Sequence, residues 1–221
     1  MNLAMFDLDH TLINCDSDSE WPKYLLQKGI VDKSFVERKN NKFYQDYCNG
    51  CLDIEEFLAF QLEPLSRFHK AELDKMHQEF MQQYILPHIT DMARLLVQSH
   101  REAGDELLLI SATNEFLITP IAHYFGIEHI IGVCLETDST GNYTGGYIGV
   151  PSFKEGKITR LNQWLATQQK QLSDYDKTYF YSDSHNDLPL LKLVDEAVAV
   201  NPDNRLYEYA HQHGWPVLNF I

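Results

Sequence analysis

The chain has 221 residues, of which 44% are hydrophobic and 23% are charged, so it is long enough and apolar enough to bury a core and is not a disordered chain. The 18 lysines and arginines against 32 aspartates and glutamates give a formal charge of −14, which argues against binding to nucleic acid or to an anionic membrane. No apolar run approaches the roughly 20 residues of a membrane span.

The start of the chain has no basic region and no cleavage site before the apolar run at residues 3–6, so we predict no secretory signal and a cytoplasmic location. In that compartment the four cysteines are expected to be reduced thiols. Cys48 and Cys51 have the spacing of a metal or redox pair, but no second pair accompanies them. We therefore predict that they are ordinary thiols at the end of a helix.

Residues 3–6 form a short apolar run that ends in Asp7-Leu8-Asp9, a pattern that favours a buried parallel strand whose end meets solvent. From about residue 19 to 84 the apolar residues follow helical spacing, and glycine and proline divide this stretch into several helices. The block is too long for a simple crossover between two strands. We therefore predict that residues 15–87 form an all-helical cap.

After residue 87 the pattern alternates between helices and strands, which is typical of a parallel sheet with right-handed crossovers. The predicted strands cover residues 107–110, 130–133, 178–181 and 197–200. A hairpin is predicted between residues 138 and 149. The predicted fold class is therefore α/β, a Rossmann-like parallel sheet flanked by helices. Residues 1–14 and 88–221 would form this core, with the cap inserted between them.

Polar residues follow three of the predicted strands at the point where each strand ends. Asp7 and Asp9 follow the first strand, and Ser111 follows the second. Asp183 and Asp187 follow a later strand. Because ligands bind beyond the carboxyl ends of parallel strands, we expect these side chains to converge on one crevice. The carboxylates would repel one another there, and an all-oxygen set of donors suits Mg²⁺.

Four short motifs link the sequence to a known family. They are Asp7-Leu8-Asp9-His10-Thr11, Ser111-Ala112-Thr113, the lysine of Glu155-Gly156-Lys157, and Asp183-Ser184-His185-Asn186-Asp187. Together they resemble the haloacid dehalogenase-like hydrolases, in particular the phosphoserine-phosphatase-like branch (subfamily IB) with a helical cap after the first strand. The resemblance covers nearly the whole chain, and its first and last motifs are the specific ones.

The resemblance implies a Mg²⁺-dependent phosphatase that forms an aspartyl-phosphate. Asp7 would be the nucleophile. Asp9 would be the general acid and then the general base, and its backbone carbonyl would also ligate the metal. Asp183 would ligate Mg²⁺ directly, and Asp187 would ligate it or hold a water on it.

The resemblance also implies which groups bind the phosphate. Ser111, at the start of a helix, would donate its hydroxyl and neighbouring amides to the phosphate. Lys157 would neutralise the nucleophile and the phosphoryl oxygens. The implied substrate-binding residues are Thr11, Ser111, Ala112, Lys157 and Asn186. Ser184 stands where relatives usually have glycine, but the two carboxylates of its motif keep their spacing.

The expected partner is a small phosphorylated metabolite, with phosphoserine, histidinol phosphate, sugar phosphates and nucleotides as candidates. We expect no nucleic acid or membrane partner, and a monomer or a small homo-oligomer. Two alternatives to hydrolysis stay open. One is transfer of the phosphoryl group to an alcohol. The other is a phosphate-binding regulatory module that does not turn over, which Asp9, Ser111 and Lys157 disfavour.

The predicted cap offers several candidates for substrate recognition. Asp16 and Glu20 could face a substrate ammonium group or could be solvated. Arg38 and Arg67 lie in the cap, but neither is a clear counterpart of the arginine that binds the carboxylate in phosphoserine phosphatases. Five aromatic residues of this stretch are predicted to belong to the hydrophobic core: Phe43, Tyr44, Tyr47, Phe57 and Phe60.

Overall fold

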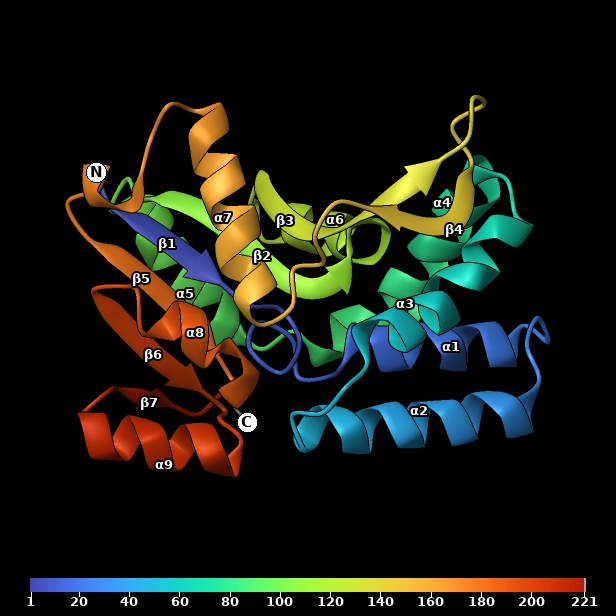
Figure 1. Cartoon of the computed structure of the whole chain (residues 1–221), viewed down its shortest axis with the longest axis horizontal. Helices are drawn as coiled ribbons and strands as arrows, with labels where there is room; N and C mark the ends of the chain where they lie inside the picture. The colour runs from blue at the N-terminus through green and yellow to red at the C-terminus, as the bar shows by residue number, and fades with distance from the viewer. Residues whose placement is uncertain (221) are drawn as a thin grey trace.

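The computed structural model describes residues 1–220, apart from the side chain of residue 35. Residue 221, the last of the predicted core segment, lies outside this range. The strands (Figure 1) are β1 (Leu3–Phe6), β2 (Glu106–Asn114), β3 (His129–Thr137), β4 (Tyr143–Ile148), β5 (Thr178–Ser182), β6 (Glu196–Val200) and β7 (Val217–Leu218). The α-helices are α1 (Ser17–Gln27), α2 (Lys33–Cys48), α3 (Ile54–Leu62), α4 (Lys70–Phe80), α5 (Asp91–Glu102), α6 (Glu115–Tyr124), α7 (Glu155–Thr167), α8 (Leu188–Leu191) and α9 (Asn204–His213).

The strands within residues 1–220 form one sheet in the order β4-β3-β2-β1-β5-β6-β7. Neighbouring strands are parallel except β3 and β4, which are antiparallel. The hairpin expected between residues 138 and 149 therefore has only its turn and second strand there, because its first strand is the end of β3. β1 lies between β2 and β5, with Leu3 in register with Glu106 on one side and with Thr178 on the other. The predicted α/β fold is confirmed. The carboxyl ends of β1, β2 and β5 therefore meet at one edge of the sheet.

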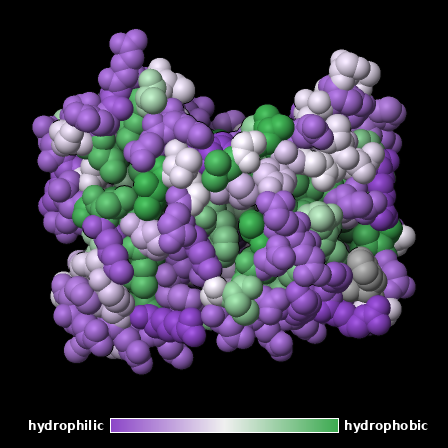
Figure 2. All heavy atoms as spheres, in the orientation of Figure 1, coloured by the Kyte–Doolittle hydropathy of each residue, from purple (hydrophilic) through white to green (hydrophobic). Residues whose placement is uncertain are grey.

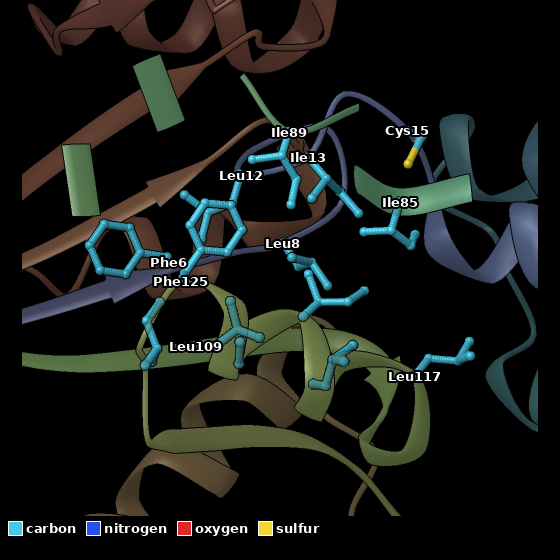
Figure 3. Close-up of a cluster of buried hydrophobic side chains, with 14 of the residues drawn as sticks. Phe6, Leu8, Leu12, Ile13, Cys15, Ile85, Ile89, Leu109, Leu117 and Phe125 are labelled. Atoms are coloured by element: carbon cyan, nitrogen blue, oxygen red, sulfur yellow. The ribbon is translucent and has the colours of Figure 1, made fainter. Parts of the chain in front are cut away.

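β1 is buried on both faces, and its side chains alternate between two hydrophobic layers. Leu3 and Met5 belong to the layer that the sheet forms with α7, α8 and α9. Ala4 and Phe6 belong to the larger layer, which includes α5, α6 and the helices that precede α5. Figure 3 shows the part of this larger layer around Phe6. Covering both faces of the sheet leaves its edge as the place where polar side chains can gather.

Residues 15–87, which we call the helical segment, form α1 to α4 at one end of the sheet (Figure 1). An aromatic cluster joins this segment to α6. The ring of Trp21 lies 5.1 to 5.3 Å from the rings of Tyr24, Phe80 and Phe116, measured between centroids. Because one hydrophobic layer runs from α1 and α4 into α6, the division of the chain into a core and a cap stays a prediction.

The hairpin of β3 and β4 also contacts the helical segment. Tyr147 of β4 donates a hydrogen bond to the carboxylate of Glu55 in α3. The backbone N–H of Lys70, at the start of α4, donates to Asn142 in the hairpin turn at 2.9 Å. The helical segment is therefore attached to the sheet both through α6 and through this hairpin.

Two details of the C-terminal half refine the sequence-based expectation. The helix expected after Asp183 begins as a 3₁₀ turn (His185–Asp187) and continues as α8 from Leu188; Ser184 caps the turn by accepting from the N–H of Asn186. The strand β7 follows α9, where none was expected. It has two residues and pairs with the end of β6, so it is too short to show an alternating pattern.

The surface agrees with the composition. The face in Figure 2 is largely hydrophilic, in keeping with the charge of −14. Cys15, Cys48, Cys51 and Cys134 are free thiols, as predicted. None of the helices within residues 1–220 is long and apolar enough to cross a membrane.

Candidate active site

The loop after β1 turns sharply and leaves Asp7 and Asp9 at the edge of the sheet. The N–H of Asp7 still donates to the carbonyl of Tyr181 in β5, at 2.9 Å, so the sheet itself fixes its position. The carbonyl of Leu8 then accepts from the backbone N–H groups of residues 11–13. Asp7 is 6% exposed, and both aspartates line one cavity beyond the strand ends.

Lys157 is buried between two of the carboxylates. Its ammonium group lies 2.9 Å from Asp7 Oδ1 and 2.7 Å from Asp187 Oδ2. Burial alone lowers the pKa of Lys157, but Asp187 and Asp7 raise it more, so the net shift is upward and the lysine stays charged. One cation is thus shared by two anions that have little access to water.

The position of Lys157 depends on the glycine before it. A Cβ atom at Gly156 would lie 2.0 Å from the carbonyl oxygen of Pro151. Glycine therefore lets the first turn of α7 pass close to this carbonyl. Lys154, directly before α7, has a φ of 50°, which is a strained value for a residue with a side chain. The turn that places Lys157 is thus tightly constrained.

Asp183 and Asp187 lie at the end of β5. Ser182 donates to Asp187 Oδ2 at 2.7 Å, and the Thr11 hydroxyl donates to Asp183 Oδ1 at 3.4 Å. Burial raises the pKa of Asp183 well above its ordinary value, and the charges of Asp7 and Asp187 raise it further. Burial likewise raises the pKa of Asp7 to about 7, although Lys157 lowers it. The strand ends therefore hold more carboxyl groups than can be ionised together without a further cation.

Ser111 does not begin a helix, contrary to the prediction. β2 continues to Asn114, which pairs with Val133 after a local irregularity in the register. The side chain of Asn114 accepts from the N–H of Leu117 and is the N-cap of α6, whose first residue is Glu115. Thr113, the other capping type of residue beside the helix, uses its hydroxyl toward Asp9 and Asp18, so Asn114 is the residue that caps the helix. Ser111 instead lines the cavity from the strand.

One cavity, of about 580 Å³, brings together almost all the predicted site residues. Those that line it are Asp7, Asp9, Ser111, Ala112, Lys157, Asp183, Asn186 and Asp187. Thr11 is the exception, because it lies behind Asp183 and is buried. The volume suits a small organic ligand.

Asp9 is held by a hydrogen bond on each of its carboxylate oxygens. The N–H of Ser17 donates to Oδ1 at 2.7 Å, and the hydroxyl of Thr113 donates to Oδ2 at 2.9 Å. The same hydroxyl lies 2.9 Å from Asp18 Oδ2. Burial raises the pKa of Asp9 to about 6, and the charge of Asp16 contributes. Sequence reasoning missed Asp18 and the role of Thr113, because their contact joins residues 95 positions apart.

The other wall of the cavity comes from the helical segment and is aromatic. Phe43, Tyr44, Tyr47 and Phe57 line it. The predicted core position is confirmed for Phe43, which is 3% exposed, and is wrong for Tyr44, which is 58% exposed. Helical spacing identifies the apolar face of α2 but does not tell whether that face meets other helices or a cavity. Phe60 packs against Phe43 and does not line this cavity.

The charged residues of the helical segment divide differently from the expectation. Asp16 lines the cavity, and its carboxylate also accepts from the N–H and hydroxyl of Ser19, as the N-cap of α1. Glu20 does not line the cavity and forms an ion pair with Lys23. Arg38 and Arg67 are likewise not among the lining residues, and Arg67 pairs with Glu63 on the surface.

The end of α2 is attached to the loop after β5. The Tyr47 hydroxyl donates to Ser184 Oγ at 2.8 Å, and Asn186 Nδ2 donates to the carbonyl of Tyr47 at 3.2 Å. The ammonium group of Lys154 donates to the carbonyl of Gly50 at 2.7 Å. Ser184, which departs from the usual glycine, therefore supplies a contact that helps to close the cavity.

The donor set at the strand ends fits Mg²⁺. Asp7 and Asp183 are buried carboxylates whose ionisation is opposed by burial and by their mutual repulsion, and a dication would relieve both. Within residues 1–220, no three His, Cys, Asp or Glu side chains are grouped as a metal site by themselves. Mg²⁺ usually binds one or two carboxylates, keeps several waters and contacts substrate phosphate, so Asp7 and Asp183 offer the number of carboxylates that it needs.

Comparison with known proteins gives consistent similarities. Residues 4–192 match the sequence profile of the haloacid dehalogenase-like hydrolases. A protein of Neisseria meningitidis named histidinol-phosphatase is 65% identical, over 99% of both chains. A crystal structure of a Bordetella pertussis protein of unknown function is 42% identical, with a TM-score of 0.93 over 100% of this chain and 99% of that one. A phosphoserine phosphatase, solved as an analogue of its phospho-aspartyl intermediate, is 19% identical with a TM-score of 0.69, over 99% and 93% of the chains, and shows the fold alone.

Removing the buried cation is expected to destabilise the protein in a pH-dependent way. Lys157→Met leaves Asp7 and Asp187 buried without their partner, which typically costs about 3–5 kcal/mol. A carboxyl whose pKa is raised by folding, as that of Asp7 is to about 7, binds more protons when folded, so stability falls as the pH rises from about 4 to about 7. The loss should therefore be large at about pH 7.5 and smaller at about pH 5. Urea denaturation with EDTA present measures it.

Lys75→Met, which changes an exposed lysine of α4, is the control and should be nearly neutral at both pH values. An equal loss of stability for Lys157→Met at both values would contradict the assignment of buried, mutually repelling carboxylates.

Proposed function

Because the chain belongs to the haloacid dehalogenase-like hydrolases and is a phosphoric monoester hydrolase, we propose that it hydrolyses histidinol phosphate through a phosphoryl-aspartate at Asp7. The observation that carries this proposal is the buried pair of Asp7 and Lys157 in a cavity whose opposite wall is acidic and aromatic. The name of the Neisseria meningitidis relative supports the same substrate. Since the chain is a hydrolase, the regulatory module without turnover is set aside.

Asp7 attacks the phosphorus, so that a bond from its carboxylate oxygen to phosphorus forms while the bond to the leaving alkoxide breaks. Lys157, 2.9 Å from Asp7, reduces the repulsion between this carboxylate and the phosphate oxygens. Ser111 donates its hydroxyl to a phosphoryl oxygen from within β2. Burial of these groups strengthens each of the electrostatic contacts.

Asp9 acts as the proton donor to the leaving oxygen. It then takes a proton from the water that attacks the phosphorus, which breaks the bond between phosphorus and the Asp7 carboxylate oxygen and releases phosphate. Its raised pKa of about 6, caused chiefly by burial, makes a proton on Asp9 more accessible near neutral pH than on a solvated aspartate. No observation favours transfer to an alcohol, so hydrolysis is the proposed reaction.

Asp7, Asp183 and the backbone carbonyl of Asp9 would hold Mg²⁺. Bound Mg²⁺ supplies positive charge that stabilises the phosphate oxygens and orients the phosphoryl group. Asp187 would contribute through a water molecule, because its Oδ2 already accepts from Lys157 and Ser182.

The helical side of the cavity favours histidinol phosphate over phosphoserine. Asp16 offers a carboxylate, and Phe43, Tyr44 and Phe57 offer aromatic surface, which matches the ammonium group and the imidazole ring of histidinol. No lysine or arginine of the helical segment is among the lining residues that the structure describes. On this wall the carboxylate of phosphoserine would therefore lie near Asp16 without a cation to pair with it. Arg205, which also lines the cavity, belongs to α9, and its guanidinium group lies 3.5 Å from the carbonyl oxygen of Asn49, just after the end of α2.

Phosphate release from histidinol phosphate and from phosphoserine tests this assignment. Placing a substrate carboxylate near like charges costs several kcal/mol, so we expect kcat/KM for histidinol phosphate to be higher by about 100-fold or more. Asp16→Asn keeps a side chain that can cap α1 but removes the charge. It should raise KM for histidinol phosphate by about 10-fold and leave p-nitrophenyl phosphate, which has no ammonium group, unaffected. Equal kcat/KM for the two metabolites would refute the substrate assignment.

Metal removal gives a second prediction. EDTA should abolish activity and added Mg²⁺ should restore it. Asp183→Asn removes one of the two charges that face the cation, so the Mg²⁺ concentration for half-maximal activity should rise by about 10-fold or more. Asp195→Asn, which changes an aspartate at the opposite end of β5 that accepts from Thr178, should leave this requirement unchanged. Full turnover by the chelated protein would contradict the proposed dependence on Mg²⁺.

The third prediction separates Asp7 from Asp9. Asp7→Asn should form no covalent phosphoenzyme. Asp9→Asn should lose roughly 10²–10⁴-fold on alkyl phosphates, but an aryl phosphate needs little protonation and should still phosphorylate Asp7. With saturating Mg²⁺ this variant should accumulate a hydroxylamine-labile phosphoryl label with a burst of aryl product. Covalent label on Asp7→Asn, or parent turnover of alkyl phosphates by Asp9→Asn, would show that the assigned roles are wrong.

A further inference from the structure

Three buried polar atoms on α1 have no hydrogen-bond partner among the residues that the structure describes. They are Ser17 Oγ, Asp18 Oδ1 and Trp21 Nε1. Asp18 is the one that can ionise, and it is 8% exposed. Gln61 of α3 donates to its backbone carbonyl at 2.7 Å and not to its carboxyl group. A buried carboxyl group in which one oxygen has no hydrogen-bond partner requires an explanation.

The other oxygen of Asp18 contacts the hydroxyl of Thr113, which also contacts Asp9. Asp18 Oδ2 lies 2.9 Å from Thr113 Oγ1, and the same Oγ1 lies 2.9 Å from Asp9 Oδ2. A hydroxyl has one proton to donate and two lone pairs that accept. Two ionised carboxylates would therefore compete for a single proton. If the proton went to Asp9, the Asp18 carboxylate would be buried and charged with no donor; if it went to Asp18, Asp9 would keep only the N–H of Ser17.

A protonated Asp18 removes this conflict. Its O–H donates to Thr113, and Thr113 donates its own proton to Asp9, so both contacts have a donor and an acceptor. The surroundings favour this state. Burial raises the pKa of Asp18 well above its ordinary value, and the charges of Asp16 and Asp9 raise it further.

We propose that Asp18 is a positioning residue that, as a neutral carboxylic acid, donates to Thr113 and thereby commits the Thr113 hydroxyl to Asp9. The N–H of Ser17 holds the other oxygen of Asp9, so the Asp9 carboxyl group is fixed from both sides. This inference rests on the proposed function, in which Asp9 protonates the leaving oxygen. Proton transfer in the transition state requires a donor held in a narrow range of positions.

The competing interpretation is that Asp18 is ionised and binds the substrate ammonium group, since it lines the same cavity as Asp16. The two interpretations differ for Asp18→Asn. An amide N–H can donate to Thr113 as the carboxylic acid does, but an amide cannot neutralise an ammonium group.

The kinetic test compares four variants on histidinol phosphate and on p-nitrophenyl phosphate. Asp18→Asn and Thr113→Ser keep the hydrogen bonds and should stay within about threefold of the parent kcat. Asp18→Leu and Thr113→Val break them and should lower kcat for histidinol phosphate by about 10- to 100-fold, with little change in KM. The burst with p-nitrophenyl phosphate, whose leaving group needs little protonation, should keep the parent rate.

Two further measurements separate positioning from general damage to the fold. The double variant of Asp18→Leu with Thr113→Val should lose no more than Thr113→Val alone, because both changes remove one interaction. The infrared difference spectrum between the parent and Asp18→Asn, recorded with Mg²⁺ at about pH 7.5, should contain the C=O band of a carboxylic acid.

Each contrary outcome has a distinct meaning. If Asp18→Asn raises KM for histidinol phosphate as strongly as Asp16→Asn does, Asp18 is an ionised substrate ligand and the proposal is wrong. A loss in the rate of the p-nitrophenyl phosphate burst as large as the loss of kcat on histidinol phosphate, for Asp18→Leu and Thr113→Val, would indicate a merely structural role. If the parent hydrolyses no phosphomonoester, the proposed function fails. The infrared band then still decides whether Asp18 is neutral, and its absence would overturn the proposal.

Discussion

A buried excess of negative charge is the constraint on which the rest of the site depends. Asp7, Asp183 and Asp187 are all less than one tenth exposed, and Lys157 is the cation that contacts two of them. Burial raises the pKa values of Asp7 and Asp183, because water no longer stabilises their charges. Two features of the fold offset this charge. Lys157 is placed by a turn that requires glycine at position 156, and the oxygen donors at the strand ends fit a dication.

Asp9 has the same problem of burial but a different solution. No cation contacts its carboxylate among the described residues; instead the N–H of Ser17 and the hydroxyl of Thr113 each occupy one oxygen. The difference agrees with the proposed roles. A nucleophile such as Asp7 must be ionised when it attacks, and a neighbouring cation favours that state. A group that gives and takes a proton is better served by neutral donors that orient it.

The two walls of the cavity come from different parts of the chain and carry different tasks. The strand ends hold the charged groups on a rigid sheet, whereas the helical segment contributes Asp16 and the aromatic residues. The contacts of Tyr47 with Ser184 and Asn186 join the two walls. Side chains on α2 can therefore change which substrate fits without moving the residues at the strand ends, as is common where a scaffold and a recognition element are separate.

The sequence by itself determined the order of the elements and the residues at the strand ends. Runs such as residues 3–6 are buried on both faces, so they show as continuous apolar stretches, and the motifs that follow them place Asp7 and Asp183 directly. Only the tertiary structure decided that Ser111 belongs to a strand, that Phe43 and Tyr44 face a cavity, and that Thr113 lies between Asp9 and Asp18. Helical spacing tells which face of a helix is apolar but not what that face meets. A hydrogen bond between side chains 95 positions apart leaves no pattern in the sequence, because folding alone brings them together.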